Sequence, residues 1–261
     1  MMLKDKVAVV YGAGGAIGGA VARAFARDGA TVFLTGRQRA PVDAVAKDIA
    51  WAGGCADVAV VDALDDHAVD THLQSVVDKA GRVDISFNAI GLPATNVVGV
   101  PLLEIDADMF SYPIASYTRS YFLTARAAAR RMIANRSGVI MTITSLPARA
   151  GGLLLGGYGP AHAAKEALTR SLSAELSPHG IRVVGLRPHG MPETHTMREV
   201  YERKGGGLTW EQFQGYLAST THPKRVMALA EVGNVAAFMA SDHASGMTGT
   251  TVNLTMGSLD D

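Results

Sequence analysis

The chain has 261 residues, of which 24 are Lys or Arg and 24 are Asp or Glu, so its formal net charge at pH 7 is zero. This balance argues against a nucleic-acid partner or an anionic membrane surface, because either would require an excess of basic side chains. A hydrophobic content of 48% is enough for a sizeable core, and the length predicts one α/β domain over residues 1–261.

The first predicted element is the strand Val7–Tyr11, a short apolar run that follows charged residues and ends in a glycine-rich turn. The run is too short for a membrane span or for the apolar region of a signal peptide. The single cysteine, Cys55, cannot form an internal disulfide, which fits a reducing compartment. We therefore expect a soluble cytoplasmic protein.

Short runs rich in Val, Ile and Thr alternate with longer amphipathic segments along the chain. The runs predict strands and the longer segments predict helices. Near-continuous apolar strands indicate a parallel sheet covered on both faces, so we expect a Rossmann-type, doubly wound α/β fold of about seven strands. The predicted strands are Val7–Tyr11, Thr31–Thr35, Val58–Val61, Ile85–Asn88, Gly138–Thr144, Ile181–Leu186 and Thr251–Leu254. The predicted helices are Ala16–Asp28, Ala40–Ala52, Asp66–Ala80, Met109–Asn135, Ala161–Ser177 and Glu231–Ala240.

One segment, from His189 to Arg225, interrupts this alternation. It contains no strand pattern, carries several Met, Tyr and Trp residues, and includes three consecutive glycines at 205–207. We expect it to be a lid inserted over the carboxyl edge of the sheet, where open α/β sheets bind their ligands.

A glycine-rich turn, YGAGGAIG, connects the first predicted strand to the first predicted helix. Glycines at such a turn let backbone N–H groups approach a pyrophosphate at the helix N-terminus. Because the turn lies inside a βαβ pattern, it predicts a dinucleotide site rather than a tight turn without a ligand. The predicted contacts are Gly12, Gly14, Gly15, Ile17 and Gly18.

The second predicted strand ends in TGRQR, without the acidic residue that would bind the ribose 2′-hydroxyl of NAD. Arg37 and Arg39 stand there instead, and guanidinium groups suit a 2′-phosphate, so NADP(H) is favoured over NAD(H). After the third strand, Asp62 can accept a hydrogen bond from the adenine amino group, or it can cap the following helix.

The order of these motifs resembles the short-chain dehydrogenase/reductase family along nearly the whole chain. The family's glycine motif, T-G-x-x-x-G-x-G, corresponds to YGAGGAIG with Ala16 in place of the middle glycine. Its N-N-A-G segment corresponds to Asn88–Gly91, in which Ala89 replaces the second asparagine. Its catalytic serine and tyrosine correspond to Ser145 and Tyr158, which are thirteen residues apart as is common in the family.

The family's proline-glycine pair after the sixth strand corresponds to Pro188-His189-Gly190, and its C-terminal signature to FMASDHASGMTGTTVNL. The resemblance implies that a further group of residues binds the nicotinamide cofactor. They are Asn88, Ala89, Gly91, His162, Pro188, Gly190 and Thr194.

The resemblance also implies catalytic roles. Tyr158 is the general acid or base for a carbonyl oxygen, and Ser145 polarises the same oxygen. The family's lysine, which binds the nicotinamide ribose and lowers the pKa of the tyrosine, corresponds to His162. An unperturbed tyrosine has a pKa of about 10 and a histidine about 6.5. We therefore expect His162 to bind the ribose while carrying only a fractional charge at neutral pH.

Two other residues compete for part of this chemistry. Lys165 lies on the same helical face as Tyr158, but about 10.5 Å further along the axis, so it reaches His162 more readily than the ribose. The helix asparagine of the family corresponds to Tyr117, which either fills the vacated space or directs its hydroxyl into the pocket as a proton donor.

A metal site is a further possibility in PHGMPETHTM, where His189, Glu193 and His195 are the candidate ligands. Their spacing matches neither H-E-x-x-H nor another zinc pattern, so we expect no metal.

The expected function is an NADP-dependent oxidoreductase that transfers hydride between the nicotinamide and a small, largely apolar carbonyl, alcohol or imine substrate. The alternatives are a nucleotide-binding protein without redox turnover, and an isomerase or lyase that uses Tyr158 with His162. The resemblance implies a homodimer or homotetramer.

The apolar residues expected near the substrate are Leu153, Leu154, Leu155, Met191, Met197, Tyr201 and Trp210, although a core position or a subunit contact would explain them equally well.

Overall fold

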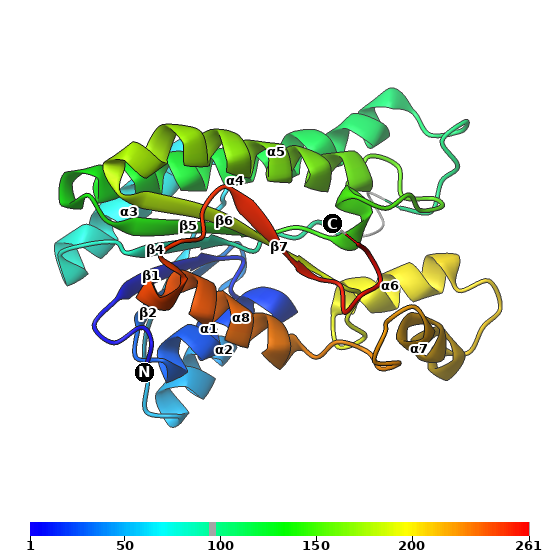
Figure 1. The fold of residues 1–261 in the computed structure, drawn as a ribbon, viewed down its shortest axis with the longest axis horizontal. Helices are drawn as coiled ribbons and strands as arrows, with labels where there is room; N and C mark the ends of the chain where they lie inside the picture. The colour runs from blue at the N-terminus through cyan, green and yellow to red at the C-terminus, as the bar shows by residue number, and fades with distance from the viewer. Residues whose placement is uncertain (94–97, 261) are drawn as a thin grey trace.

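Seven parallel strands form one sheet in the computed structural model, which describes residues 1–93 and 98–260 (Figure 1). Their order across the sheet is β3-β2-β1-β4-β5-β6-β7, which confirms the predicted α/β architecture. The strands are β1 (Val7–Tyr11), β2 (Thr31–Gly36), β3 (Cys55–Val60), β4 (Ile85–Asn88), β5 (Gly138–Ile143), β6 (Ile181–Pro188) and β7 (Thr250–Leu254). β3 begins before the predicted Val58, because Cys55 and the residues after it pair with β2 from Thr31 onward.

The chain order reverses beside β1, which pairs with β2 on one side and with β4 on the other. The chain passes from β1 to β2 and β3 on one side of the sheet, and from β4 to β5, β6 and β7 on the other. Because these connections lead away from each other, a crevice opens beyond the carboxyl ends of β1 and β4. This topological switch point is where open α/β sheets bind ligands. It places the glycine turn after Tyr11 beside the segment that follows Asn88, as shown by the hydrogen bond from the Ala89 N–H to the Tyr11 carbonyl oxygen at 3.0 Å.

Helices cover both faces of the sheet (Figure 1). One layer is formed by α1 (Ala16–Arg27), α2 (Arg39–Trp51) and α8 (Leu229–Ala240), and the other by α3 (Asp66–Ala80), α4 (Ala107–Met132) and α5 (Tyr158–Leu176). Each layer encloses a hydrophobic cluster against its face of the sheet. The apolar runs predicted this double coverage, and the side chains of the central strands β1, β4 and β5 are buried on both faces.

The helix starts follow from local chemistry. Asp65 caps α3 by accepting from the Ala68 N–H at 3.0 Å, and Asp106 caps α4 by accepting from the Met109 N–H at 2.7 Å. α5 begins at Tyr158, three residues before the predicted start. Proline is tolerated in a first helical turn, so Pro160 does not delay this start, and Tyr158 occupies the first position of the helix.

Residues 189–225 contain two helices and no strand, as expected for the lid. They are α6 (His195–Lys204) and α7 (Trp210–Ser219), which lie beyond the carboxyl end of β6 (Figure 1). Tyr201, Trp210 and Phe213 pack together with ring centroids 5.2 to 5.8 Å apart. Tyr201 and Trp210 therefore pack within the lid itself, which agrees with the core position expected for them as an alternative to a place near the substrate.

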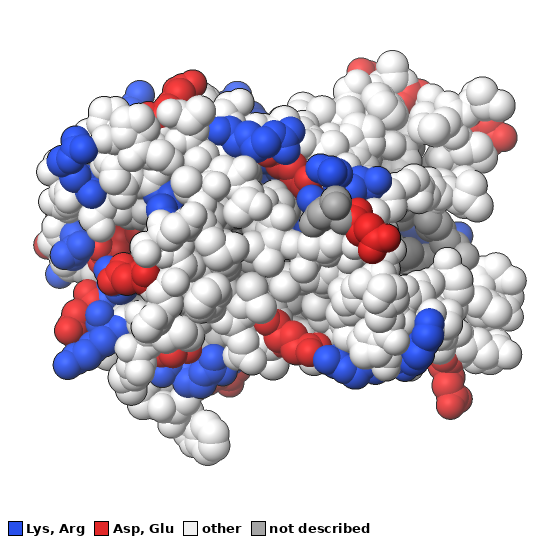
Figure 2. All heavy atoms as spheres, viewed as in Figure 1, with Lys and Arg blue, Asp and Glu red and all other residues white. Residues whose placement is uncertain are grey.

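The surface carries charges of both signs. On the face drawn in Figure 2, Lys and Arg are interspersed with Asp and Glu around a broad uncharged centre. Within the described residues, no helix combines the length and apolar character needed to cross a membrane.

Candidate active site

A pocket of about 710 Å³ lies at the carboxyl edge of the sheet, at the topological switch point beside β1. The glycine turn, the ends of β4, β5 and β6, the start of α5 and the first part of the lid line it. Most of the residues singled out from the sequence meet there. They are Gly12, Gly14, Gly15, Ile17, Gly18, Arg37, Asp62, Ala89, Gly91, Ser145, Tyr158, His162, Pro188, Gly190 and Thr194.

The glycine turn forms a closely packed backbone cradle. Gly12 has a φ of +76°, and a Cβ at this position would lie 2.6 Å from the Ala89 carbonyl oxygen. A Cβ at Gly18 would collide with the Gly12 carbonyl oxygen. Gly15 is the N-cap of α1 and has no side chain to satisfy the first N–H groups of the helix, which leaves them available to an anion. The cradle therefore fits a pyrophosphate.

The two arginines after β2 have different environments. Arg37 is exposed and lines the pocket. Arg39 is the first residue of α2, lies outside the pocket lining and pairs with Asp43 at 3.2 Å. Of the two predicted 2′-phosphate ligands, Arg37 is therefore the one that the fold places at the pocket.

Asp62 lines the pocket and does not cap α3, a role that belongs to Asp65. Its carboxylate accepts from the Leu64 N–H at 3.0 Å, and the side chain is exposed. The helix-capping role considered for Asp62 is therefore wrong, and adenine recognition stays a prediction.

Asn88 has a structural contact. Its side chain is buried, and its amide donates to the Thr124 hydroxyl of α4 at 3.1 Å. It does not appear in the pocket lining, whereas its neighbour Ala89 does. Asn88 thus joins β4 to α4 behind the pocket.

Ser145 and Tyr158 meet in the pocket. Ser145 lies two residues after the end of β5, and Tyr158 opens α5. Burial raises the pKa of Tyr158 above its ordinary value, and a hydrogen bond from the Ser145 side chain opposes part of this rise. A tyrosine with a raised pKa stays protonated at neutral pH, so this pair is suited to donating a proton rather than accepting one.

His162 packs against two tyrosine rings. Its ring centroid lies 4.4 Å from that of Tyr158 and 4.9 Å from that of Tyr117. Burial, together with the charge of Lys165, lowers the pKa of His162 well below its ordinary value. The imidazole is therefore neutral, and the fractional charge expected from the sequence is absent at neutral pH.

Both ring nitrogens of His162 are buried and lack a hydrogen-bond partner among the described residues. Such orphaned nitrogens are costly unless a ligand satisfies them. His162 also lines the pocket, one turn beyond Tyr158. A neutral imidazole at this place can donate one hydrogen bond and accept another, which suits the vicinal hydroxyls of a ribose.

Lys165 is fully buried and does not line the pocket. Its Nζ donates to the Ile143 carbonyl oxygen at 2.7 Å and lies 5.6 Å from the ring centroid of Tyr117. Burial lowers the pKa of Lys165 to about 7. The lysine thus binds the end of β5 and lies against the Tyr117 ring. Because it does not line the pocket, it cannot contact a ribose bound there.

Tyr117 lies in the pocket with its hydroxyl occupied. The hydroxyl oxygen accepts from the Leu92 N–H at 3.1 Å, and the ring is 4% exposed. Sequence reasoning did not identify this contact, which fixes the chain after β4. It also did not identify Leu92 or Glu199 as lining residues, because neither belongs to a recognisable motif.

The polar side chains of the segment after β6 make hydrogen bonds that stabilise the segment itself. Thr194 caps α6 by accepting from the Met197 N–H at 3.2 Å. His189 contacts the Thr220 hydroxyl at 3.0 Å, and Glu193 accepts from the Leu229 N–H at 3.0 Å. Within the described parts of the chain, no three His, Cys, Asp or Glu side chains converge in an arrangement able to hold a metal ion.

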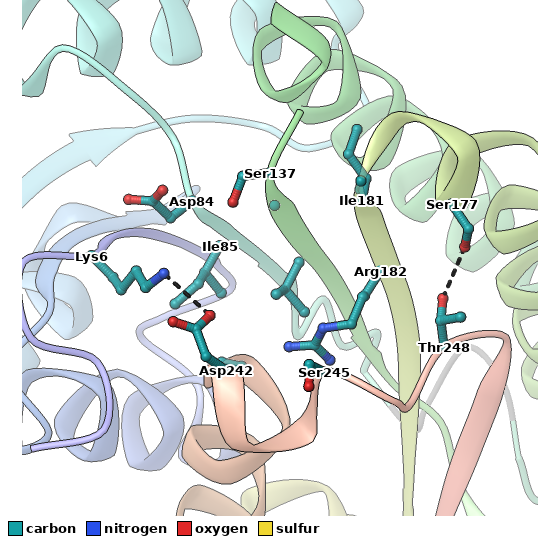
Figure 3. Close-up of a pocket in the computed structure, with 14 residues that line it drawn as sticks. Lys6, Asp84, Ile85, Ser137, Ser177, Ile181, Arg182, Asp242, Ser245 and Thr248 are labelled. Carbon is teal, nitrogen blue, oxygen red and sulfur yellow. Dashed lines mark hydrogen bonds and ion pairs between the residues drawn. The ribbon is translucent and has the colours of Figure 1, made fainter. Parts of the chain in front are cut away.

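A second pocket, of about 360 Å³, lies at the opposite edge of the sheet, by the amino ends of β4, β5 and β6 (Figure 3). Its main polar groups are already engaged: Lys6 pairs with Asp242 at 3.4 Å, and Arg182 donates to two backbone carbonyls. The Thr248 hydroxyl contacts that of Ser177 at 3.3 Å. These contacts stabilise the edge of the sheet at the amino ends of β4, β5 and β6.

Comparison with known proteins gives consistent matches. The family model described as Enoyl-(Acyl carrier protein) reductase matches residues 12–258. An uncharacterized oxidoreductase of Bacillus subtilis (strain 168), YxbG, is 31% identical over 254 residues, covering 96% of this chain and 89% of that protein. The (+)-borneol dehydrogenase 2 of Salvia officinalis is 28% identical over 252 residues, covering 95% of this chain and 87% of that protein. The crystal structure of NAD+-bound xylitol dehydrogenase superposes with a TM-score of 0.90 at 26% identity, covering 98% of this chain and 100% of that chain.

Proposed function

This chain belongs to the short-chain dehydrogenase/reductase family, and we propose that it is an NADP-dependent reductase of a small, largely apolar carbonyl compound. The observation that carries the proposal is the hydrogen-bonded pair of Ser145 and Tyr158 inside the pocket that contains the glycine cradle. The relatives named (+)-borneol dehydrogenase 2 and xylitol dehydrogenase indicate alcohol and carbonyl chemistry in general and do not specify a substrate.

Two structural features support a bound nicotinamide dinucleotide. The glycine turn has no room for a side chain at Gly12 and leaves the first N–H groups of α1 without a side-chain cap. The two orphaned nitrogens of His162 require hydrogen-bond partners. Arg37 would bind the 2′-phosphate of NADP, while His162 would hold the nicotinamide ribose. The bound cofactor supplies the hydride in this chemistry.

The proton in this mechanism comes from Tyr158. A substrate carbonyl oxygen would accept hydrogen bonds from the Tyr158 and Ser145 hydroxyls, and the phenol proton would pass to that oxygen as negative charge develops on it. His162 orients the cofactor and contributes no charge, because burial keeps its imidazole neutral. Leu92, Met191 and Met197 line the same pocket and favour an apolar substrate body.

The proposal is tested by NADPH consumption over a panel of ketones, aldehydes and imines. We expect Tyr158→Phe to abolish turnover while retaining NADPH binding in a fluorescence titration. Tyr216→Phe, on the exposed face of α7, is the matched control and should leave turnover unchanged. Full activity of the Tyr158→Phe variant would exclude the proposed acid.

A second candidate function is nucleotide binding without redox turnover. Its support is specific: the family's lysine is replaced by a neutral histidine, and Lys165 is committed to a backbone carbonyl. This candidate predicts NADPH binding with no consumption over the whole panel, including the reverse reaction with alcohols and NADP+.

A further inference from the structure

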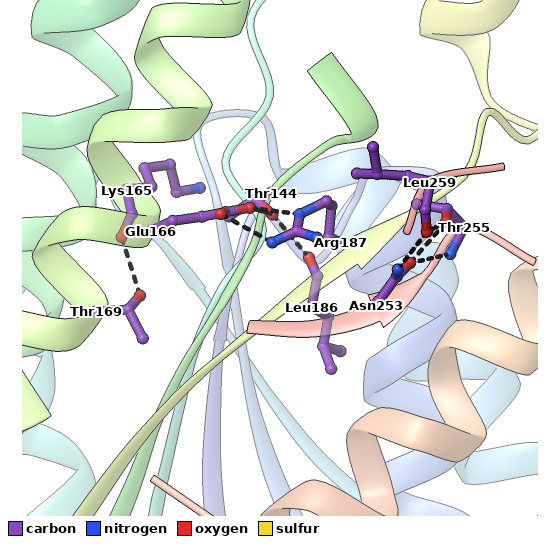
Figure 4. Close-up of polar contacts among 9 residues, drawn as sticks. All are labelled: Thr144, Lys165, Glu166, Thr169, Leu186, Arg187, Asn253, Thr255 and Leu259. Carbon is purple, nitrogen blue, oxygen red and sulfur yellow. Dashed lines mark hydrogen bonds and ion pairs between the residues drawn. The ribbon is translucent and has the colours of Figure 1, made fainter. Parts of the chain in front are cut away.

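Two oppositely charged side chains are buried behind the proposed active site, where they take no part in the chemistry described above. Glu166 on α5 and Arg187 on β6 are each 2% exposed. The Arg187 Nε donates to Glu166 Oε1 at 2.7 Å and its Nη2 donates to Oε2 at 2.9 Å (Figure 4). A fork-to-fork contact of this kind fixes orientation as well as distance.

Thr144 extends this pair to a third element. Its hydroxyl lies 3.1 Å from Glu166 Oε1, and its backbone N–H donates to the Leu186 carbonyl oxygen at 2.7 Å. Lys165, the neighbour of Glu166 on α5, donates to the Ile143 carbonyl oxygen. Two consecutive side chains of α5 therefore hold two consecutive residues at the end of β5.

Each member of this network precedes or follows a proposed active-site group by a short step along the chain. Thr144 immediately precedes Ser145, and Arg187 immediately precedes Pro188, the last residue of β6 and part of the pocket lining. Glu166 comes one helical turn after His162 and two turns after Tyr158. The network thus joins the three elements that carry the proposed acid, its serine partner and the cofactor loop.

Stability alone gives no reason for this arrangement. Removing two charges from water costs several kcal/mol per ion, and apolar side chains of similar volume often replace a buried ion pair with no loss of stability. The directional contacts provide what apolar packing lacks, namely a fixed distance between α5 and the ends of β5 and β6. A catalytic hydrogen bond is sensitive to such distances, because a displacement of about 1 Å can cost about a hundredfold in rate.

We propose that Glu166 and Arg187 are positioning residues that hold Ser145 and the loop after β6 in register with Tyr158. The proposal rests on the proposed function, because it assigns them a role in that reaction. It goes beyond that function because neither residue touches the pocket: both act through Thr144 and the backbone of β6.

The test replaces the pair by the apolar double variant Glu166→Leu/Arg187→Met, with Thr144→Val as a milder change that removes only the hydroxyl. We expect the double variant to bind NADPH within about threefold of the original chain and to lose about tenfold or more in kcat. The matched control is the surface pair of Asp66 and Arg126, whose guanidinium also contacts both carboxylate oxygens. Asp66→Asn/Arg126→Met should leave kcat unchanged.

Coupling to Ser145 distinguishes positioning from general destabilisation. In a Ser145→Ala background, the double variant should lose much less than in the original chain, because the contact it aligns is already missing. The proposal would be overturned if the double variant lost the same factor in kcat in the Ser145→Ala background as in the original chain. An unchanged kcat in a folded double variant would also overturn it. If the double variant does not fold, Thr144→Val takes its place, and its loss in kcat is compared between the original chain and the Ser145→Ala background.

A binding-independent measurement separates this proposal from the proposed function. The phenolate absorbance of Tyr158 is followed with pH as the difference between each protein and its Tyr158→Phe counterpart. Loss of the Ser145 hydrogen bond should move this titration to higher pH in the double variant, even if the original chain consumes no NADPH. Absence of NADPH consumption by the original chain would refute the proposed function, while an unmoved titration would refute the positioning role.

Discussion

The predicted correspondence of His162 to the family's lysine allows a direct test of the proposed reaction's preferred direction. In the proposed mechanism, Tyr158 is protonated for reduction and is a phenolate for oxidation. Burial raises its pKa above the ordinary value of about 10, and neutral His162 does not counteract this. We therefore expect reduction to be constant through neutral pH and to decline only above about pH 10. The rate of oxidation should rise about tenfold per pH unit from neutral pH up to about pH 10, because the phenolate fraction of Tyr158 rises in that proportion.

Substituting His162→Lys should reverse part of this bias. The ring centroids of Tyr158 and His162 are 4.4 Å apart. Two unit charges at about that distance, with an effective dielectric constant of about 20, interact by about 4 kcal/mol, equivalent to about three pKa units. Burial of the new ammonium and the nearby charge of Lys165 reduce this value. We expect the pKa of Tyr158 to fall by about one to three units.

The assay measures kcat for ketone reduction and alcohol oxidation from pH 6 to pH 11, a range that brackets the ordinary tyrosine pKa of about 10. His162→Lys should raise oxidation at neutral pH by about tenfold or more and move the decline of reduction to lower pH. His162→Gln, which hydrogen-bonds without charge, is the control and should keep the original pH dependence. Fast oxidation near pH 7 by the original chain would refute the reasoning, because it would show that Tyr158 already ionises there.

Three further predictions follow from single residues. Arg37→Gln should weaken NADPH binding about tenfold or more and NADH binding little, whereas Arg39→Gln, whose side chain is engaged by Asp43, should change both less, by fluorescence titration. Gly12→Ala should lower the melting temperature and abolish NADPH binding, because φ is +76° and the added methyl meets a backbone oxygen; unchanged binding would contradict the cradle. Burial lowers the pKa of His72 to about 4, so the unfolded chain binds its proton first as the pH falls below 6.5. The free energy of unfolding should therefore fall by up to about 3 kcal/mol between pH 6.5 and pH 4, and less in His72→Leu, by urea denaturation.

Much of the fold follows from local pattern. The strands Val7–Tyr11 and Ile85–Asn88 have the predicted bounds, because each is a short apolar run between a polar residue and a turn. The start of α5 was predicted three residues late. Pairing of β3 with β2 decided the bounds of β3, and such pairing depends on a distant segment that local propensity does not report.

The candidate site divides in the same way. The glycine turn and the spacing of Ser145 and Tyr158 were visible in the sequence, because each is a motif of fixed residue types at fixed separations. The roles of Arg37 and Arg39 could not be separated there, since both follow the same strand. Only the fold shows that the second arginine starts a helix and pairs within it.

The sequence by itself determined the alternation of strands and helices, the cradle at the first turn and the residues that could donate a proton. Tertiary structure alone decided their charge states and their alignment. His162 is neutral because it is buried between Tyr117 of α4 and Tyr158 of α5, near Lys165. Glu166 reaches Arg187 because α5 packs against β6. A pKa depends on the desolvation and charges around a group, and these come from segments that are distant in the chain and adjacent only after folding.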